Sequence, residues 1–252
     1  MADRPTPARL RALRAQDPKT RARDLAAMHG FPEATLVAAH VGHGVTVIDP
    51  TPDRLIPAVQ GLGDVLALTR NASCVHERKG TYQGYHAGPQ AQMVLGAEID
   101  LRIFPTHWVH GFAVEEATAE GVKRSVQVFD AAGDAVHKVH LTSASDVAGF
   151  AALVKALRLP DQRDILNPAP TAQVDAARGD PSRVADLREE WDRMTDTHQF
   201  LHLVRKLKMN RLGAYRMVGA PQARALAPRS VTEALTRSAE GRVPLMIFGH
   251  LE

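Results

Sequence analysis

Apolar residues in the first 42 positions are spaced as in short amphipathic helices, with prolines between them. Asp17-Pro18 and Phe31-Pro32-Glu33 each set a proline where a helix can begin, so we expect two or three short helices that end near Gly42. The next elements expected are a strand over 45–48, a helix over 54–60 and a strand over 65–68.

Between residues 73 and 142 the spacing of apolar residues changes from helical to alternating, which is typical of strands. Turn-forming segments such as Ala132-Gly133-Asp134 separate the runs, and this arrangement favours an antiparallel sheet. The predicted strands cover 74–82, 92–95, 99–104, 108–114, 125–129 and 136–141, and a helix over 146–157 follows them.

Residues 158–180 carry several prolines and little apolar periodicity, which predicts a linker or a surface crossover. Beyond them the expected elements are helices over 181–193, 198–207, 211–218 and 231–239 and a strand over 243–248. This order repeats the opening of the chain at a separation of 178 residues, the distance from Val65 to Val243.

The predicted fold class is therefore α+β, a tandem repeat of a unit made of helices and an antiparallel sheet. We expect a first copy over 1–157, a linker over 158–180 and a partial second copy over 181–252. The sheet of residues 73–142 has no counterpart before Glu252, so the second copy is expected to lack most of its sheet. Chance repetition of helices is the alternative.

Composition narrows the classes of function. The chain of 252 residues is 44% hydrophobic and 23% charged, and no run reaches the ~20 apolar residues of a membrane span, so we expect a cytoplasmic protein. Cys74 is the single cysteine, which excludes an intrachain disulfide and a thiolate zinc site. The net charge of +3 is compatible with anionic partners, and the glycine-based nucleotide and hydrolase motifs are absent.

His198 is the strongest candidate for chemistry. Thr195 and Asp196 can cap a helix, so His198 is expected in its first turn, with His202 and Arg205 on the same side. The other side carries an apolar stripe of Phe200, Leu203, Val204 and Leu207. A neutral imidazole can bind a transition metal or haem iron, whereas a solvated polar helix is the alternative. As a metal pair, His198 and His202 lack the intervening glutamate of zinc proteases.

A second candidate is the strand over 98–104. Asp100, Arg102 and Phe104 share one face of it, which either lines a site or is an exposed face with a weak Asp100–Arg102 pair. His76 and His86 are further candidate imidazoles, although a strand histidine without a second ligand is more often structural.

Three segments together resemble the bacterial haemin-utilisation proteins of the HemS type, also called haemin-degrading factors. They are Arg70-Asn71-Ala72-Ser73-Cys74-Val75-His76-Glu77 with Gly80-Thr81-Tyr82, Glu98-Ile99-Asp100-Leu101-Arg102-Ile103-Phe104, and Glu190-Trp191-Asp192-Arg193-Met194-Thr195-Asp196-Thr197-His198-Gln199-Phe200. The last segment is the most specific, and the resemblance runs from about residue 8 to residue 248.

The resemblance implies a cytoplasmic protein of two tandem α+β copies that binds one haem in the cleft between them. It implies that His198 is the axial iron ligand, that Arg102 lies on the distal side and that Phe104 lies beside the macrocycle. Arg211 resembles the family's propionate-binding arginine. His76 corresponds to a histidine considered as an alternative ligand.

The implied function is haem-iron uptake and utilisation. Whether the porphyrin is also degraded is left open; if it is, haem is both cofactor and substrate and Arg102 is the distal catalytic residue. A carrier or storage protein that delivers haem to partners is the alternative, with the cytoplasmic side of a haem ABC transporter as a candidate partner. A basic nucleic-acid-binding module is a rival of another class, but the chain lacks a recognised DNA-binding motif and no nucleic-acid partner is expected.

Overall fold

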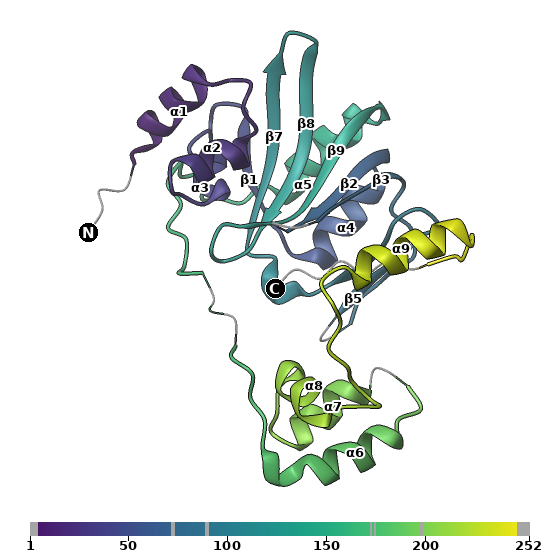
Figure 1. Ribbon diagram of the computed structural model, residues 1–252. Coiled ribbons are helices and arrows are strands. Elements are labelled where there is room, and N and C mark those ends of the chain that lie inside the picture. Colours follow the sequence, from purple (N-terminus) through teal and green to yellow (C-terminus); the bar gives the residue numbers. More distant parts are fainter. Residues whose placement is uncertain are drawn as a thin grey trace. The chain divides into compact units, whose positions relative to one another are not determined.

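The computed structural model describes residues 5–71, 74–88, 91–171, 173, 175–196 and 199–245. These residues form two compact units, the first ending at residue 171 and the second running from 173 to 245. Figure 1 shows the first as helices and strands and the second as a group of helices. No helix among the described residues is long and apolar enough to cross a membrane.

Three short helices open the first unit, as the sequence predicts: α1 (Pro7–Gln16), α2 (Ala22–Met28) and α3 (Glu33–Ala38). They share a buried cluster of Leu10, Leu25, Leu36 and Ala39. The helix start expected at Asp17-Pro18 is wrong. Asp17 instead closes α1, and its carboxylate accepts a hydrogen bond from the Thr20 amide, so this segment is a turn and α2 begins at Ala22.

Six antiparallel strands form the main sheet, in the order β1-β7-β8-β9-β2-β3. They are β1 (Val45–Ile48), β2 (Gly63–Arg70), β3 (Val75–Gly80), β7 (His110–Thr118), β8 (Gly121–Phe129) and β9 (Ala135–Ser145). The predicted antiparallel pairing is confirmed. β7 and β8 extend past their apolar runs because their outer ends pair through charges, including Arg124 Nε to Glu115 Oε1 at 2.9 Å.

A separate three-stranded antiparallel sheet lies between β3 and β7 in the chain, in the order β4-β5-β6. Its strands are β4 (Tyr85–His86), β5 (Gln92–Leu95) and β6 (Asp100–Ile103), followed by the 3-10 turn η1 (Pro105–His107). β5 and β6 match predicted strands. The two residues of β4 are too few for an alternation to be recognised in the sequence.

One apolar core joins both sheets of the first unit to helices α4 (Pro52–Gln60) and α5 (Val147–Leu157). The helices contribute Leu55, Ile56, Val59, Phe150, Leu153 and Leu157, and the small sheet contributes Val94 and Ile103. α5 begins where the sequence predicts, with the Asp146 carboxylate accepting a bond from the Ala148 amide. The small sheet is therefore packed onto the main sheet and does not stand alone.

Residues 158–171 lie against the first unit and are held there by specific bonds. The side chain of Gln162 contacts the amide and the carbonyl of Val47 at 3.0 and 2.8 Å. Arg11 Nη1 of α1 lies 3.0 Å from Asp164 Oδ2. This part of the chain consequently covers the outer strand β1 and protects its edge from pairing with another chain.

The second unit consists of the turn η2 (Pro181–Arg183) and helices α6 (Val184–Asp192), α7 (Gln199–Lys206), α8 (Arg211–Val218) and α9 (Ser230–Glu240). Its core is formed by Leu187, Phe200, Leu203, Val204, Leu207, Met209, Ala214 and Val218. The strand expected over 243–248 is wrong for residues 243–245, because the Val243 amide bonds to the Ser238 carbonyl and closes α9. Residues 246–248 lie outside the described residues.

Candidate functional site

Strand β6 carries Asp100 and Arg102, and Phe104 follows its last residue. Along residues 99–104 the side chains of Ile99, Leu101 and Ile103 face the core, and those of Asp100, Arg102 and Phe104 face outward. Phe104 retains 44% of its surface. The alternation read from the sequence is therefore correct, and it places a large aromatic ring and a guanidinium on one exposed face.

Arg102 forms an ion pair on this exposed face. Its Nη1 lies 2.8 Å from Asp100 Oδ1, two residues back on the same strand. Both side chains are about half exposed, so water screens the attraction and the pair contributes little to stability. An anionic or hydrogen-bond-accepting ligand could replace Asp100 as the partner of the guanidinium.

Two more residues share this face, and sequence reasoning missed the grouping. Met93 of β5 lies opposite Arg102, and His86 of β4 lies opposite Met93. Cross-strand partners point to the same side of a sheet, so an imidazole, a thioether and a guanidinium form a row across three strands. The sequence gives no signal for this row, because it depends on the register of strands that periodicity alone does not set.

His76, the alternative ligand implied by the resemblance, lies on the edge strand β3. Every residue of β3 except Gly80 is exposed. His76 pairs in register with Thr69 of β2, which places the imidazole on the same sheet face as Thr69. His76 therefore does not belong to the row of His86, Met93 and Arg102 on the small sheet.

The principal candidate, His198, lies outside the described residues. The helix that follows it does match the prediction, since the apolar stripe Phe200, Leu203, Val204 and Leu207 is buried. His202 and Arg205 are exposed on the other side of α7. The pattern that assigned His198 to the polar side of this helix is therefore correct for its two described neighbours.

The described residues on either side of His198 bond to one another. The Thr195 amide donates to Gln199 Oε1 at 3.0 Å, and Gln199 Nε2 donates to Thr195 Oγ1 at 3.3 Å. The Gln199 amide also bonds to the Asp196 carbonyl at 3.1 Å. These contacts fix the start of α7 relative to Thr195 and Asp196. The sequence predicts that Thr195 and Asp196 cap the helix and does not predict the reciprocal bonds of Gln199.

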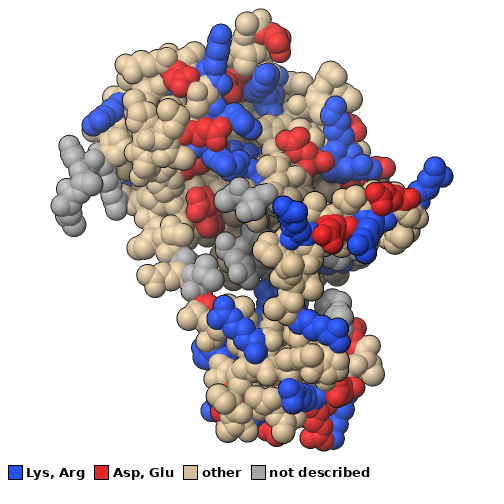
Figure 2. All heavy atoms as spheres, viewed as in Figure 1, with Lys and Arg blue, Asp and Glu red and all other residues tan. Residues whose placement is uncertain are grey.

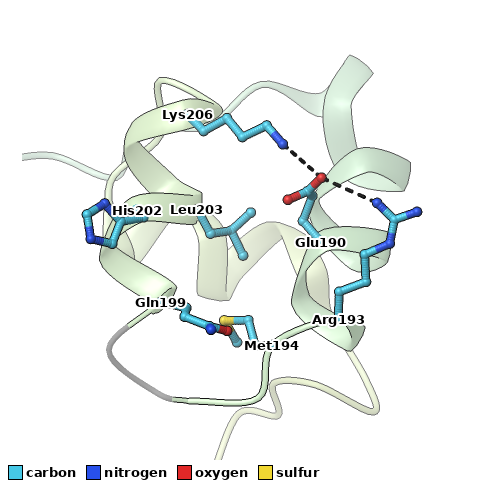
Figure 3. Close-up of a pocket in the computed structure, with 7 residues that line it drawn as sticks. All are labelled: Glu190, Arg193, Met194, Gln199, His202, Leu203 and Lys206. Carbon is cyan, nitrogen blue, oxygen red and sulfur yellow. Dashed lines mark hydrogen bonds and ion pairs between the residues drawn. The ribbon is translucent and has the colours of Figure 1, made fainter.

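A hollow of about 360 Å³ lies beside this segment, between α6 and α7 (Figure 3). Met194 and Gln199 line it at one end. At the other end Glu190 Oε1 lies 2.9 Å from Lys206 Nζ and 3.7 Å from Arg193 Nη1, so the carboxylate occupies the position between the two cations. In Figure 3 the His202 ring points away from the other residues drawn.

Arg211 is the first residue of α8 and is exposed. The positive end of a helix dipole generally favours an acidic residue over a cation at such a position. On the same helix, Tyr215 stacks on Phe200 with ring centroids 5.1 Å apart, and Trp191 contacts both rings edge-on. This aromatic cluster holds α6, α7 and α8 together.

The described residues do not include a cluster of side chains that could bind a metal ion directly. No three His, Cys, Asp or Glu side chains gather there in a way that could hold an ion. Basic and acidic side chains are interspersed over both units in the view of Figure 2, without a continuous basic stripe.

The fold and the candidate site define an α+β protein that exposes Arg102 on its small sheet and Phe104 directly after it. Residues 30–157 match the family described as the haemin-degrading HemS.ChuX domain. The chain belongs to this family. Its hemin transport relative HmuS of Yersinia pestis is 34% identical over 237 residues, covering 93% of this chain and 68% of the relative.

Two solved structures extend the comparison over nearly the same length. Holo-PhuS, a haem-binding protein from Pseudomonas aeruginosa, has a TM-score of 0.84 at 40% identity, with 94% of this chain and 70% of that chain covered. ChuS, a haem-degrading enzyme of Escherichia coli O157:H7, has a TM-score of 0.77 at 28% identity, with 93% and 68% covered. The expected family and the mixed α+β fold are confirmed.

Proposed function

We propose that this chain binds haem in haem-iron uptake and utilisation. The observation that carries the proposal is the similarity to HmuS and to holo-PhuS, which spans both units of the chain. In this proposal His198 is the axial ligand of the iron, through a neutral imidazole nitrogen. The haem is the molecule handled as well as the cofactor of any reaction on it.

The outer face of the small sheet suits a flat, largely apolar macrocycle. Phe104 and Met93 offer an aromatic ring and a polarisable thioether, and both can lie against a porphyrin. Arg102 supplies the donor assigned to the distal side. The guanidinium would leave Asp100, 2.8 Å away, in order to bind a ligand group.

Arg211 is proposed to bind a haem propionate. A guanidinium presents parallel donors that match the two oxygens of a carboxylate. Its exposed position at the start of α8 leaves the side chain accessible to a ligand. His76 remains an alternative ligand only, since it lies on the exposed edge strand and not on the row with Arg102.

We also propose that the second unit repeats the helical part of the first. A shift of 178 residues carries the starts of α3 and α4, Glu33 and Pro52, onto the starts of α8 and α9, Arg211 and Ser230. The same shift carries the starts of α1 and α2 to within one residue of those of α6 and α7. Four helices in one register support the repeat more strongly than the weak sequence match does.

The turns that follow α2 and α7 support the same register. The Phe31 amide bonds to the Ala26 carbonyl, and 178 residues later the Met209 amide bonds to the Val204 carbonyl. In both turns the residue before, Gly30 or Lys208, has a positive φ. A shared turn geometry of this kind is independent of side-chain identity.

Haemin titration of the purified chain tests the binding function. The wild type is expected to develop a Soret band with saturable binding, and His198→Ala is expected to bind at least about 10-fold more weakly with a shifted band. His202→Ala is the matched control, because it removes an exposed imidazole from the same helix. Equal spectra and affinities for all three proteins would remove His198 as the axial ligand.

The fate of the bound haem is a second question. We propose transfer to or from the cytoplasmic side of a haem ABC transporter as the carrier role, with porphyrin opening as the enzymatic role. Adding ascorbate to the haem complex separates them. Loss of the Soret band with release of iron supports degradation, and a persistent band with haem passing to an apo acceptor supports a carrier.

A further inference from the structure

His137 is a buried imidazole to which neither the family resemblance nor the proposed haem site assigns a role. It lies on β9 and is 4% exposed. Its Nε2 lies 2.5 Å from the Tyr82 hydroxyl and its Nδ1 lies 2.7 Å from Thr69 Oγ1. All polar atoms of the ring are therefore bonded within the core of the first unit.

The bonding pattern fixes the tautomer. A neutral imidazole has one donor and one acceptor nitrogen. The Tyr82 hydroxyl is buried and its bond to His137 is its only one among the described residues, so its proton has no other acceptor there. Tyr82 consequently donates to Nε2, and Nδ1–H donates to Thr69. Burial supports the neutral ring, because it lowers the pKa of His137 to about 4.

The ring also has an aromatic partner on its flat side. Trp108 stacks on His137 with centroids 5.8 Å apart and planes 19° apart. Tyr82 meets the ring edge-on, with centroids 6.1 Å apart. The imidazole is thus held on two sides by aromatic side chains and along its plane by two hydrogen bonds.

The partners of His137 occupy informative places in the chain. Tyr82 comes three residues before β4 and Trp108 comes directly after η1, which follows β6. Both the entry to the small sheet and the exit from it therefore contact one side chain of the main sheet. The outer strand β4 has only two residues and the sheet shares its core with the main sheet, so contacts at its entry and exit help to determine where it lies.

We propose that His137 is a positioning residue that holds the three-stranded sheet and so fixes where β6 presents Arg102 and Phe104. The claim that this positioning serves haem binding rests on the proposed function. The claim that His137 positions the small sheet does not. An apolar side chain would fill the same space and would often stabilise the core as well or better. A directed Tyr82–His137–Thr69 network instead accepts only one arrangement of the small sheet against the main sheet.

Hydrogen exchange on the haem-free chain tests the structural part. Tyr82→Phe removes one hydroxyl and keeps the aromatic ring. His137→Leu replaces the imidazole by an apolar side chain that cannot form either hydrogen bond. Both are expected to raise amide exchange in residues 85–103 by about 10-fold relative to β7 and β8. His140→Gln, on the other face of the same strand, is the matched control and is expected to leave this ratio unchanged. An unchanged ratio in Tyr82→Phe, or a uniform rise in all strands, overturns the proposal.

Haemin titration of the same variants tests the purpose. His137→Leu is expected to bind haemin about 10-fold more weakly, and His137→Gln is expected to recover part of this loss, because an amide can both accept from Tyr82 and donate to Thr69. A wild type that binds no haemin refutes the proposed function and leaves the exchange result standing. A wild type that binds haemin no better than His137→Leu refutes the positioning role. Should His137→Leu fail to fold, Tyr82→Phe alone decides both tests.

Discussion

Lys208 adopts the left-handed backbone conformation that Gly30 adopts 178 positions earlier in the chain, with φ of 56° against 72°. Each residue follows a helix, and each amide bonds back to a carbonyl three residues before it, that of Arg205 or Ala27. Glycine takes up this conformation without a penalty, whereas a lysine Cβ crowds the following carbonyl. The first unit therefore has the easier residue at this turn, and the second unit carries strain.

Replacing Lys208 by glycine is expected to stabilise the second unit by about 0.5–1 kcal/mol. The relief of backbone strain outweighs the greater freedom of glycine in the unfolded chain. Urea unfolding followed by Trp191 fluorescence, in a Trp108→Phe background, measures the change in that unit alone.

Arg205→Gly provides the control for Lys208→Gly. Arg205 lies within α7 in the right-handed conformation, so glycine there is expected to cost about 1 kcal/mol. A loss of stability in Lys208→Gly comparable to that in Arg205→Gly would contradict the interpretation of strain.

Gly213→Ala is expected to destabilise the second unit by about 2 kcal/mol. A Cβ at this position in α8 would collide with the backbone of Arg178. That backbone cannot move aside cheaply, because the Arg178 amide and carbonyl both bond to Asn210, at 2.9 Å each. Thermal unfolding measures the effect. Leu212→Ala, at the exposed neighbouring position, is expected to change stability by less than about 0.5 kcal/mol, and an equally mild Gly213→Ala would show that the segment yields.

Local signals in the sequence are enough to predict most helices and several strands. The limits of β1 and α8 agree with expectation to the residue. The start of α5 directly after Asp146 follows from the capping carboxylate of that residue, which acts within one turn. The prediction of a helix start at Asp17 fails because the same carboxylate can instead accept a bond within a turn, from the Thr20 amide.

Features that depend on pairing between distant strands could not be predicted in this way. The outward direction of Arg102 follows from period-two alternation, but its row with Met93 and His86 follows from strand register. The contacts of His137 with Tyr82 and Thr69 join residues 55 and 68 positions apart. No spacing rule covers such separations, so a buried histidine network is invisible in the sequence.

Acidification is expected to destabilise the first unit through His137. Burial, and secondarily the neighbouring His140, lower the pKa of His137 from 6.5 to about 4. The unfolded chain therefore binds more protons than the folded chain between these values, so this stabilisation is complete above about pH 6.5 and is lost as the pH falls toward 4. The loss attributable to this group between about pH 7.5 and about pH 5 is on the order of 2 kcal/mol.

Unfolding free energies across this range measure the slope, and His137→Gln is the comparison, because an amide does not titrate. The variant is expected to start less stable and to lose less on acidification. Parallel curves for wild type and His137→Gln would mean that other groups carry the pH dependence, among them His140, whose pKa burial also lowers.

Asp100→Asn is expected to strengthen haemin binding about two- to three-fold with almost no effect on folding. The carboxylate holds Arg102 at 2.8 Å, and a ligand on the guanidinium must displace it. An asparagine leaves the shape of the strand and weakens that competition, because its amide oxygen is uncharged. Both side chains are about half exposed, so unfolding free energy should change by less than about 0.5 kcal/mol.

Haemin titration at low and high salt measures the difference in affinity between wild type and Asp100→Asn, which should shrink as salt screens the pair. Arg102→Ala, with Asp100 intact, should weaken binding, and a double variant should bind like Arg102→Ala alone. An Asp100→Asn effect that persists without Arg102 would show that the carboxylate acts on the haem directly and not through the guanidinium.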